Sequence, residues 1–251
     1  MSIPRFMLPP EFWVVDLGNT RIKLGRFCDG SLLEVHAYIR ERAGEALEWL
    51  LTQPSSGYAL LATGLGESKW IAQLSSIAKV WQPTAGAAGL LKVAYETPQT
   101  LGIDRLAAAA GAAAIYPASP LLVIDAGTCI TYERVDASGT YLGGNISPGL
   151  RLRLRAMHEF TGKLPLVPIR ADVAEWGSNT RQALQLGALR GAALEVAGAI
   201  SAFRQNDPKG YVLLCGGDVP FLRPLLPSGL DYRPHLVFEG MAQLYAHAHA
   251  Q

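Results

Sequence analysis

The chain has 251 residues, of which 49% are apolar and 17% are charged, so it is too apolar for a disordered protein. It is also long enough to bury a large core, as one large domain or two lobes, without a disulfide or a structural metal. Its 22 basic and 21 acidic residues give a net charge of +1, which excludes a strong overall attraction to nucleic acid or anionic membrane. We therefore expect neither partner.

Cysteine usage and apolar patterning both indicate a cytoplasmic protein. Cys28, Cys129 and Cys215 are far apart and have no CxxC spacing, which favours buried free thiols in a reducing compartment. The first ten residues contain adjacent prolines and no continuous apolar run before a cleavage site, so they predict no secretory signal. The longest apolar stretch, residues 106–116, is shorter than the roughly 20 residues of a membrane-spanning helix.

The chain begins with a strand, a tight polar turn and a second strand. An apolar run at 12–15 precedes Asp-Leu-Gly-Asn-Thr at 16–20, and an alternating segment follows at 21–27. A Cys-Asp-Gly-Ser turn then leads to a further apolar run that predicts a third strand. Helical patterns follow at residues 40–51, 67–79 and 104–116.

The second half of the chain repeats this opening. An apolar run at 120–124 precedes Asp-Ala-Gly-Thr at 125–128, and strand patterns follow at 129–135 and from 140 onward. Two ordinary hairpin turns that share Asp and Gly would look similar, but the repeat favours two related lobes, residues 1–118 and 119–251. The remaining patterns are helices at 150–160, 179–204 and 239–250 and a short strand at 211–214. Alternating strands and helices predict an α/β architecture.

The turn at 16–20 carries residue types that bind phosphate and metal. Asp16 follows a buried strand and can hold Mg²⁺, while Gly18 lets a phosphate approach the backbone N–H groups. Lys23 shares a strand face with Arg21 and can neutralise phosphate charge. A second such turn beginning at Asp125 would allow the pair to bracket a triphosphate.

Three further features permit both a functional and a structural interpretation. Asp104 and Arg105 begin an alanine-rich helix, and composition alone slightly favours a helix-starting acid beside a solvated arginine. Gly-Gly-Asn-Ile-Ser-Pro-Gly at 143–149 predicts a tight loop that either admits a ligand or joins a strand to a helix. Three arginines alternate along one predicted helix and should spread over different faces; they are Arg151, Arg153 and Arg155.

Taken in order, these motifs resemble the type III pantothenate kinases, members of the acetate kinase, sugar kinase, Hsp70 and actin superfamily. The resemblance rests on 16–23, Tyr95, Gly-Ile-Asp-Arg at 102–105, 125–128, 143–149, Asn179-Thr180 and Gly-Gly-Asp at 216–218. It implies an actin-like ATPase fold of two ribonuclease H-like lobes with a cleft between them. Cys215 departs from the threonine that members commonly carry, which leaves nearby adenine contacts open; packing at a strand end is the favoured role.

The resemblance implies ATP-dependent phosphorylation of pantothenate to 4′-phosphopantothenate, the first step of coenzyme A biosynthesis. It implies Asp104 as the catalytic base, Asp125 as the ligand of a monovalent cation (K⁺ or NH₄⁺), and Asp16 as a ligand of Mg²⁺. The implied ATP contacts are Asp16, Gly18, Asn19, Thr20, Lys23 and Thr128. The implied substrate contacts are Tyr95, Gly102, Ile103, Asp104, Arg105 and Thr180, of which Thr180 could instead be a neighbour of a helix N-cap.

Two other function classes remain open from the sequence. A regulatory or accessory protein of the same fold would bind nucleotide with little chemistry, but it would not need all of Asp16, Asp104, Arg105 and Asp125. A sugar kinase or phosphatase of the superfamily is disfavoured by the short chain and the arginine of the 102–105 motif. The family also implies a homodimer, and helix-interior glycines, which cost roughly 1 kcal/mol each, favour close approach of another backbone; they are Gly187, Gly191 and Gly198.

Overall fold

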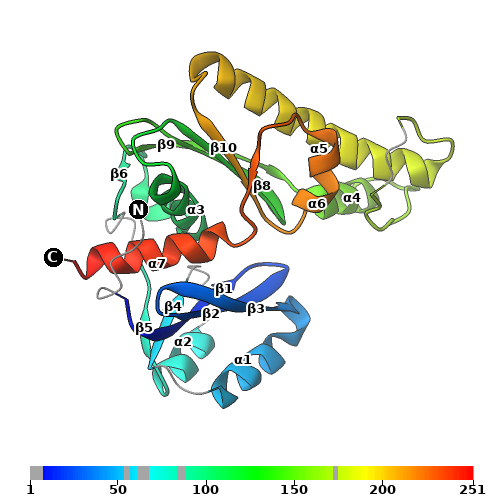
Figure 1. Cartoon of the computed structure of the whole chain (residues 1–251). Helices are drawn as coiled ribbons and strands as arrows, with labels where there is room; N and C mark the ends of the chain where they lie inside the picture. The colour runs from blue at the N-terminus through cyan, green and yellow to red at the C-terminus, as the bar shows by residue number, and fades with distance from the viewer. Residues whose placement is uncertain (1–7, 54–56, 62–67, 84–88, 172–174, 251) are drawn as a thin grey trace. The chain divides into compact units, whose positions relative to one another are not determined.

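The computed structural model describes residues 8–53, 57–61, 68–83, 89–171 and 175–250 (Figure 1). Most of the proline-containing start and the predicted helix residue Glu67 lie outside the described residues. Contacts divide the chain into a first unit of residues 1–118, 135–143 and 235–251 and a second unit of residues 119–134 and 144–234. The predicted lobes, 1–118 and 119–251, concern similarity of fold, which a division by contacts does not test, so they stay a prediction.

The first unit contains a five-stranded sheet in the order β3-β2-β1-β4-β5. Antiparallel pairing joins β1 to β2 and β2 to β3, whereas β4 runs parallel to β1 and β5 parallel to β4. The strands are β1 (Glu11–Leu17), β2 (Arg21–Cys28), β3 (Ser31–Ile39), β4 (Tyr58–Leu61) and β5 (Lys79–Trp81). The predicted opening of two strands and a turn, followed by a third strand, is confirmed.

The helices of this part are shorter than their patterns predict. Residues 40–42 form a 3₁₀ turn, so α1 (Ala43–Thr52) begins three residues later than expected. Helix α2 (Ser68–Ser75) ends before a turn and β5, which occupy the predicted last residues. Helix ends depend on capping and tertiary contacts that hydropathy does not record.

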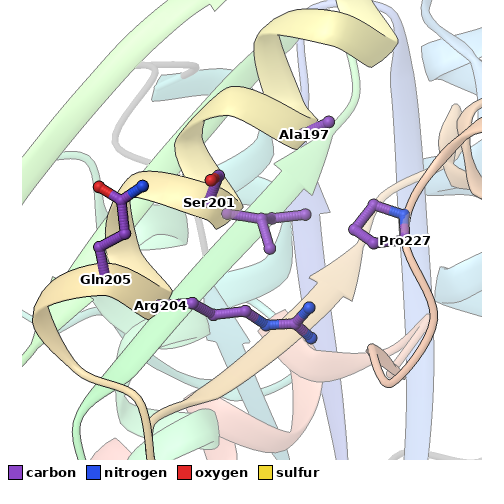
Figure 2. Close-up of a pocket in the computed structure, with 6 residues that line it drawn as sticks. Ala197, Ser201, Arg204, Gln205 and Pro227 are labelled. Carbon is purple, nitrogen blue, oxygen red and sulfur yellow. The ribbon is translucent and has the colours of Figure 1, made fainter.

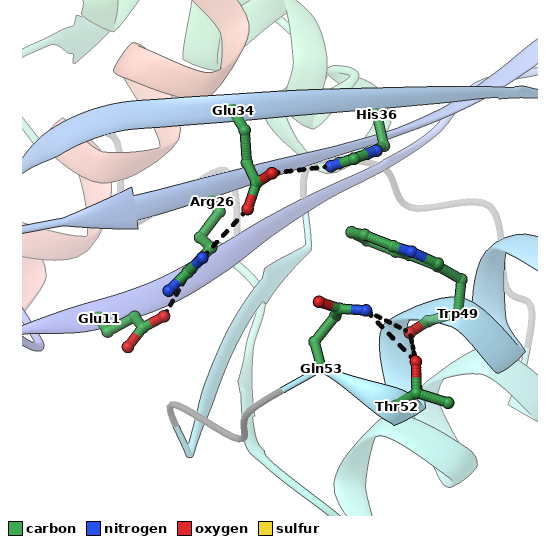
Figure 3. Close-up of polar contacts among 7 residues, drawn as sticks. All are labelled: Glu11, Arg26, Glu34, His36, Trp49, Thr52 and Gln53. Carbon is green, nitrogen blue, oxygen red and sulfur yellow. Dashed lines mark hydrogen bonds and ion pairs between the residues drawn. The ribbon is translucent and has the colours of Figure 1, made fainter.

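The sheet and these helices share one apolar core. Alternation along β2 buries Ile22 and Leu24 on one face, where they pack with Trp13, Leu47 and Leu50. Each such side chain contributes roughly 1.5–3 kcal/mol when removed from water. At the rim, Arg26 donates to Glu11 and Glu34, and Glu34 also bonds the ring of His36 beside Trp49 (Figure 3).

Two helices of the first unit pack against each other through glycine. A Cβ at Gly111 of α3 (Ile103–Ile115) would lie 2.8 Å from the Leu236 carbonyl oxygen, and one at Gly240 of α7 (Leu236–Ala248) would lie 1.8 Å from that of Ala107. Only residues without side chains permit this approach. The packing fixes α3, whose first turn carries Asp104.

A six-stranded sheet runs in the order β11-β10-β7-β8-β9-β6. Its strands are β6 (Lys92–Val93), β7 (Leu121–Ala126), β8 (Cys129–Val135), β9 (Thr140–Pro148), β10 (Tyr211–Cys215) and β11 (Asp231–Tyr232). Strand β6 and residues 135–143 belong to the first unit and the rest to the second. The other helical segments are η3 (Pro98–Thr100), α4 (Leu150–Glu159), α5 (Thr180–Asn206), α6 (Val219–Leu222) and η4 (Arg223–Leu225).

The predicted loop at 143–149 is wrong, because strand β9 continues through Pro148 and Gly149 caps helix α4. A Cβ at Gly144 would lie 1.5 Å from the Tyr132 carbonyl oxygen, so this glycine serves close packing on β8. Glycine favours a loop when sequence is considered alone, but it also occurs in strands where another backbone approaches. The strand-to-helix connection that the alternative interpretation expected is confined to Gly149.

Helix α5 covers part of the second unit's sheet. Its buried residues Leu189, Val196 and Ile200 pack with Leu122 and Ile124 of β7. With 27 residues and a mean hydropathy of 1.3 over its most apolar window, it is long and apolar enough by composition to cross a membrane, and 44% of that window is buried in the protein. The apolar surface therefore belongs in part to the core.

Candidate functional site

In the first unit, the β1–β2 hairpin brings Asp16 and Lys23 together. The two residues are paired in register, and Lys23 Nζ lies 3.9 Å from Asp16 Oδ2. The Asp16 side chain is 14% exposed and that of Lys23 is 34% exposed, so both charges lie at the edge of solvent. An acid and a cation at this spacing can bind a metal-phosphate ligand from two sides.

The turn between these strands is tight because of one glycine. A Cβ at Gly18 would lie 2.8 Å from the Arg21 carbonyl oxygen, closer than any side chain tolerates. Asn19 and Thr20 follow it and are exposed. The turn therefore presents polar side chains at the end of a hairpin whose strands are otherwise largely buried.

Asp104 occupies the first turn of α3 and is exposed. Its Oδ1 accepts a hydrogen bond of 2.9 Å from the Arg105 amide, and a Cβ at Gly102 would lie 2.5 Å from the same oxygen. The carboxylate thus lies over the helix N-terminus, where amide hydrogens and the helix dipole favour negative charge. Glycine at 102 leaves room for it, while Ile103 is buried and anchors the helix start.

Arg105 is 8% exposed, so the expectation of a solvated arginine is wrong. Its guanidinium carbon lies 6.0 Å from the centre of the Tyr95 ring, within the range of a cation–π contact. Tyr95 in turn contacts the buried ring of Tyr141, with ring centres 6.1 Å apart. The apolar stem of arginine can pack in a core while its head group contacts an aromatic ring, which composition alone does not reveal.

Gly143 completes this aromatic cluster. It has a φ of +90°, and a Cβ there would lie 3.1 Å from Tyr95 Cδ2 and 3.2 Å from Cε2. The glycine therefore contacts Tyr95 and does not form an open ligand loop. Sequence reasoning did not identify Tyr141 or this contact; the strand pattern of β9, with Tyr141 and Gly143 two residues apart on one face, was the available signal.

In the second unit, Asp125 lies near the end of β7, opposite Cys215 in the register with β10. Gly216 has a φ of +97°, and a Cβ there would lie 2.3 Å from Asp125 Oδ1. An ideal Cβ at Gly127 would lie 3.7 Å from the same Asp125 oxygen, so this glycine also faces the carboxylate. The carboxylate thus sits in a cradle of glycine backbone that a side chain would fill.

Thr128 is exposed and lies beside the start of α4. Its carbonyl oxygen accepts a 3.0 Å hydrogen bond from the Gly149 amide. A Cβ at Gly149 would lie 2.1 Å from the Gly127 carbonyl oxygen and 2.5 Å from that of Thr128. Gly149 therefore allows the helix start and the 127–128 turn to pack backbone against backbone.

The other predicted positions are described by their helices and strands. Thr180 is the exposed first residue of α5, next to the N-cap Asn179, whose side chain accepts from the Gln182 amide at 3.1 Å. Cys215 is 1% exposed at the end of β10, as a packing role requires. None of the three cysteines forms a disulfide, and Cys28 and Cys129 are only half-buried.

No cluster of three or more His, Cys, Asp or Glu side chains that could hold a metal occurs among the residues that the structure describes. A hollow of about 470 Å³ lies beside the C-terminal half of α5, and no predicted site residue lines it (Figure 2). Its Arg204 already donates to the carbonyl oxygens of Ser228 and Gly229. The hollow is therefore not part of the candidate site.

Comparison with known proteins identifies the family. The sequence model of the type III pantothenate kinases matches residues 12–202. A type III pantothenate kinase from Porphyromonas gingivalis is 39% identical over 244 residues, which cover 92% of this chain and 96% of the relative. The chain belongs to the type III pantothenate kinases. One from Bacteroides fragilis is 39% identical over 234 residues, with the same coverage.

The fold of this type III pantothenate kinase also matches solved structures. A chain from Campylobacter jejuni, named for the Baf family of transcriptional activators, aligns with a TM-score of 0.62 and 20% identity, covering 92% of this chain and 96% of that one. At that identity the likeness concerns the fold alone. The predicted α/β fold of the actin-like ATPase class is confirmed.

Proposed function

We propose that this type III pantothenate kinase transfers a phosphoryl group from ATP to pantothenate and so makes 4′-phosphopantothenate, the first step of coenzyme A biosynthesis. The observation that carries the proposal is the start of α3, where the exposed acid Asp104 adjoins the buried cation Arg105. Asp104 can accept a proton from an alcohol and Arg105 can bind a carboxylate. Pantothenate contains an alcohol and a carboxylate. The comparisons give the regulatory alternative no support.

Asp104 is proposed as the catalytic base. The amide of Arg105 and the N-terminus of α3 stabilise the ionised carboxylate, which can orient the primary hydroxyl of the substrate. Phosphoryl transfer depends mainly on in-line positioning and charge neutralisation, so Asp104 needs to accept the proton only as the new O–P bond forms.

Arg105 is proposed to bind the carboxylate of pantothenate, because its planar guanidinium matches a carboxylate with two parallel hydrogen bonds. The Tyr95 ring contacts the guanidinium and limits its orientations. The remaining substrate contacts are proposed to be Tyr95, Gly102, Ile103 and Thr180.

ATP is proposed to bind through the β1–β2 turn and the 127–128 turn, with Asp16, Gly18, Asn19, Thr20, Lys23 and Thr128 as its contacts. Lys23 would offset phosphate charge, and Gly18 would allow close approach of the backbone. Asp16 offers the carboxylate oxygen that Mg²⁺ prefers, and Asp125 offers one within a glycine cradle that suits a monovalent cation, K⁺ or NH₄⁺. When bound, these cations would neutralise phosphate charge.

The test is pantothenate-dependent release of ADP in buffer with Mg²⁺ and NH₄⁺, comparing the native chain with Asp104→Asn. We expect a fall of about 100-fold or more in the variant, since a positioned base typically contributes that much. Glu45→Gln, which changes an exposed acid in the first turn of α1, is the matched control and should keep full activity. Nucleotide binding without any such turnover in the native chain would favour the regulatory alternative.

The same assay tests the monovalent cation. We expect turnover to be lost when K⁺ and NH₄⁺ are replaced by Na⁺ and to be weakened by Asp125→Asn. Full turnover in a sodium-only buffer would remove the proposed role of Asp125.

Two properties of the whole protein complete the proposal: it is a cytoplasmic enzyme and a homodimer. The three cysteines, none of which forms a disulfide, support the first. The open glycines of α5 support the second, since an ideal Cβ at Gly187 or Gly198 would meet no described atom within 4 Å apart from the neighbouring backbone of the helix itself. At these two positions, the close backbone that the glycines led us to expect is not supplied by the described residues.

A further inference from the structure

A charged network that the proposed chemistry does not use joins α4, α5 and β8 within the second unit. Tyr132 of β8 donates to Glu195 Oε1 of α5 at 2.7 Å, and Arg153 of α4 donates through Nη2 to Glu195 Oε2. The Tyr132 residue is 4% exposed, and the Arg153 side chain is 21% exposed. The Glu195 side chain is 35% exposed, so the network is only partly shielded from water.

The protonation states of this network are well defined. Burial raises the pKa of Glu195, but the neighbouring Ser147, Tyr132 and Arg153 side chains together lower it by more, so Glu195 is ionised. Burial and the bond to Glu195 raise the pKa of Tyr132, which keeps the phenol protonated as a donor. The Glu195 carboxylate that holds Arg153 is consequently fixed in turn by the hydrogen bond from Tyr132.

Arg153 has a second bond that leads toward the predicted ATP contact. Its Nε donates to the Pro148 carbonyl oxygen at 2.8 Å, one residue before Gly149. The Gly149 amide donates to the Thr128 carbonyl oxygen, and Gly149 packs against the backbone of the 127–128 turn. A continuous path of polar contacts thus runs from Glu195 through Arg153 and the Pro148–Gly149 peptide to Thr128.

The same network lies beside one helix-interior glycine without requiring it, because a Cβ there would make only an ordinary van der Waals contact. Gly191 lies one turn before Glu195 on α5, and its ideal Cβ would lie 3.9 Å from Arg153 Nη1. The guanidinium therefore lies across the part of the helix where no side chain projects. The network also gives Arg153, the middle arginine of the alternating run, a partner on another helix. Arg155 instead bonds Glu159 of its own helix at the surface.

We propose that Arg153, fixed by Glu195, is a positioning residue for ATP: it holds the Pro148–Gly149 peptide and thereby the turn that carries Thr128. This rests on the proposed ATP contact at Thr128. Arg153 itself need not contact the nucleotide. Without its guanidinium the Pro148 carbonyl loses a charged donor, and the Gly149 amide can shift away from Thr128, so the turn would bind ATP less tightly.

The test compares Arg153→Met, which keeps the apolar stem, with Arg155→Met on the same helix. We expect the KM for ATP and the Kd for a non-hydrolysable ATP analogue to rise about tenfold in Arg153→Met, with the KM for pantothenate within about twofold of native. Arg155→Met should leave all three constants unchanged. Arg153→Lys should recover part of the lost ATP affinity, because an ammonium can donate to either the Pro148 carbonyl oxygen or a Glu195 carboxylate oxygen.

Glu195→Gln provides an independent arm that keeps the side-chain shape while removing the charge. It should raise the same two ATP constants, and the double variant with Arg153→Met should be no worse than Arg153→Met alone, because the two residues act in one path. Unchanged ATP constants in folded Glu195→Gln and Arg153→Met would overturn the proposal, as would equal rises in both KM values. Failure of the proposed function is distinct, since the native chain would then show no pantothenate-dependent turnover.

Discussion

At the scale of single residues, Gly143 illustrates how a residue without a side chain can determine the position of Tyr95, which is proposed to bind substrate. The Tyr95 ring lies where a side chain at 143 would project, and the Arg105 guanidinium carbon lies 6.0 Å from the centre of the same ring. A methyl group at 143 would press on the ring at 3.1 Å, and the ring would have to move by a few tenths of an ångström. Any such movement of the Tyr95 ring would displace the surface that the Arg105 guanidinium contacts.

We predict that Gly143→Ala raises the KM for pantothenate by about fivefold or more and leaves the KM for ATP nearly unchanged. The positive φ at 143 also adds backbone strain of about 1 kcal/mol or more to the folded state. Initial rates at varied pantothenate and varied ATP, together with thermal melts, measure the two effects separately.

Gly139→Ala is the matched control for this strain. Gly139 has a φ of +79° in the same hairpin, and its ideal Cβ would contact only the Leu90 carbonyl oxygen, at 3.4 Å. It should lower stability without changing the KM for pantothenate. Equal effects of the two variants on that KM would contradict the role given to Gly143.

The residues of the candidate site could be found from the sequence only where a motif contains them. The acids Asp16, Asp104 and Asp125 stand in recognisable local patterns, and the structure gives each a distinct setting. The burial of Arg105 could not be predicted, because it depends on Tyr95, ten residues away and outside the helix. Arg153 was seen only as one charge of an alternating run, because its partner Glu195 lies on another helix.

At the scale of secondary-structure elements, the N-terminus of α7 contains a titratable group in an unfavourable place for a positive charge. His235 occupies the N-cap position and is half-buried, with its ring 6.3 Å from that of Phe238. Burial lowers its pKa, Glu239 opposes the shift, and the charge of Lys23 adds to it. The helix dipole also disfavours a cation at this end.

We predict that this histidine makes the protein less stable in mild acid. Because the folded-state pKa is lower than the usual value near 6.5, the folded state binds the proton less readily than the unfolded chain. The stabilisation is therefore complete above about pH 6.5 and is lost as the pH falls through the folded-state pKa. Thermal melts from pH 7.5 to pH 5 should show a shallower fall in Tm for His235→Gln than for the native chain.

His247→Gln, in the last turn of the same helix, is the control and should retain the native slope. A native Tm that does not change over this pH range, or one that changes identically in His235→Gln, would contradict the prediction.

The elements themselves were largely predictable, and their limits were not. A continuous apolar run located β1, whose residues 12–15 are all buried, and alternation located β2, which buries mainly one face. Such patterns misjudged the segment 143–149, where glycines allow β9 to continue beside β8 until Gly149. Close backbone packing leaves no hydropathy signal, so these residues looked like a loop.

At the scale of the whole molecule, α5 presents a side on which Gly187 and Gly198 are open among the described residues, while Arg153 of α4 lies beside Gly191. Positions 187, 191, 194 and 198 are spaced by three or four residues and so lie along one side of the helix. Three of the four are glycines, and the fourth, Leu194, is 74% exposed. Small residues around an exposed leucine allow a second helix to approach closely, which is the geometry expected if two copies of α5 pack together.

We predict that the native protein is a dimer at micromolar concentration and that Leu194→Asp converts it to a monomer. A carboxylate at the centre of this face would have to be buried without a partner, which costs more than the packing of one leucine contributes. Light scattering coupled to size-exclusion chromatography measures the mass of both proteins. Leu33→Asp, at a leucine that is 58% exposed on β3, is the control and should remain dimeric. A monomeric native protein would remove the proposed dimer, whereas a dimeric Leu194→Asp variant would place its interface on another face.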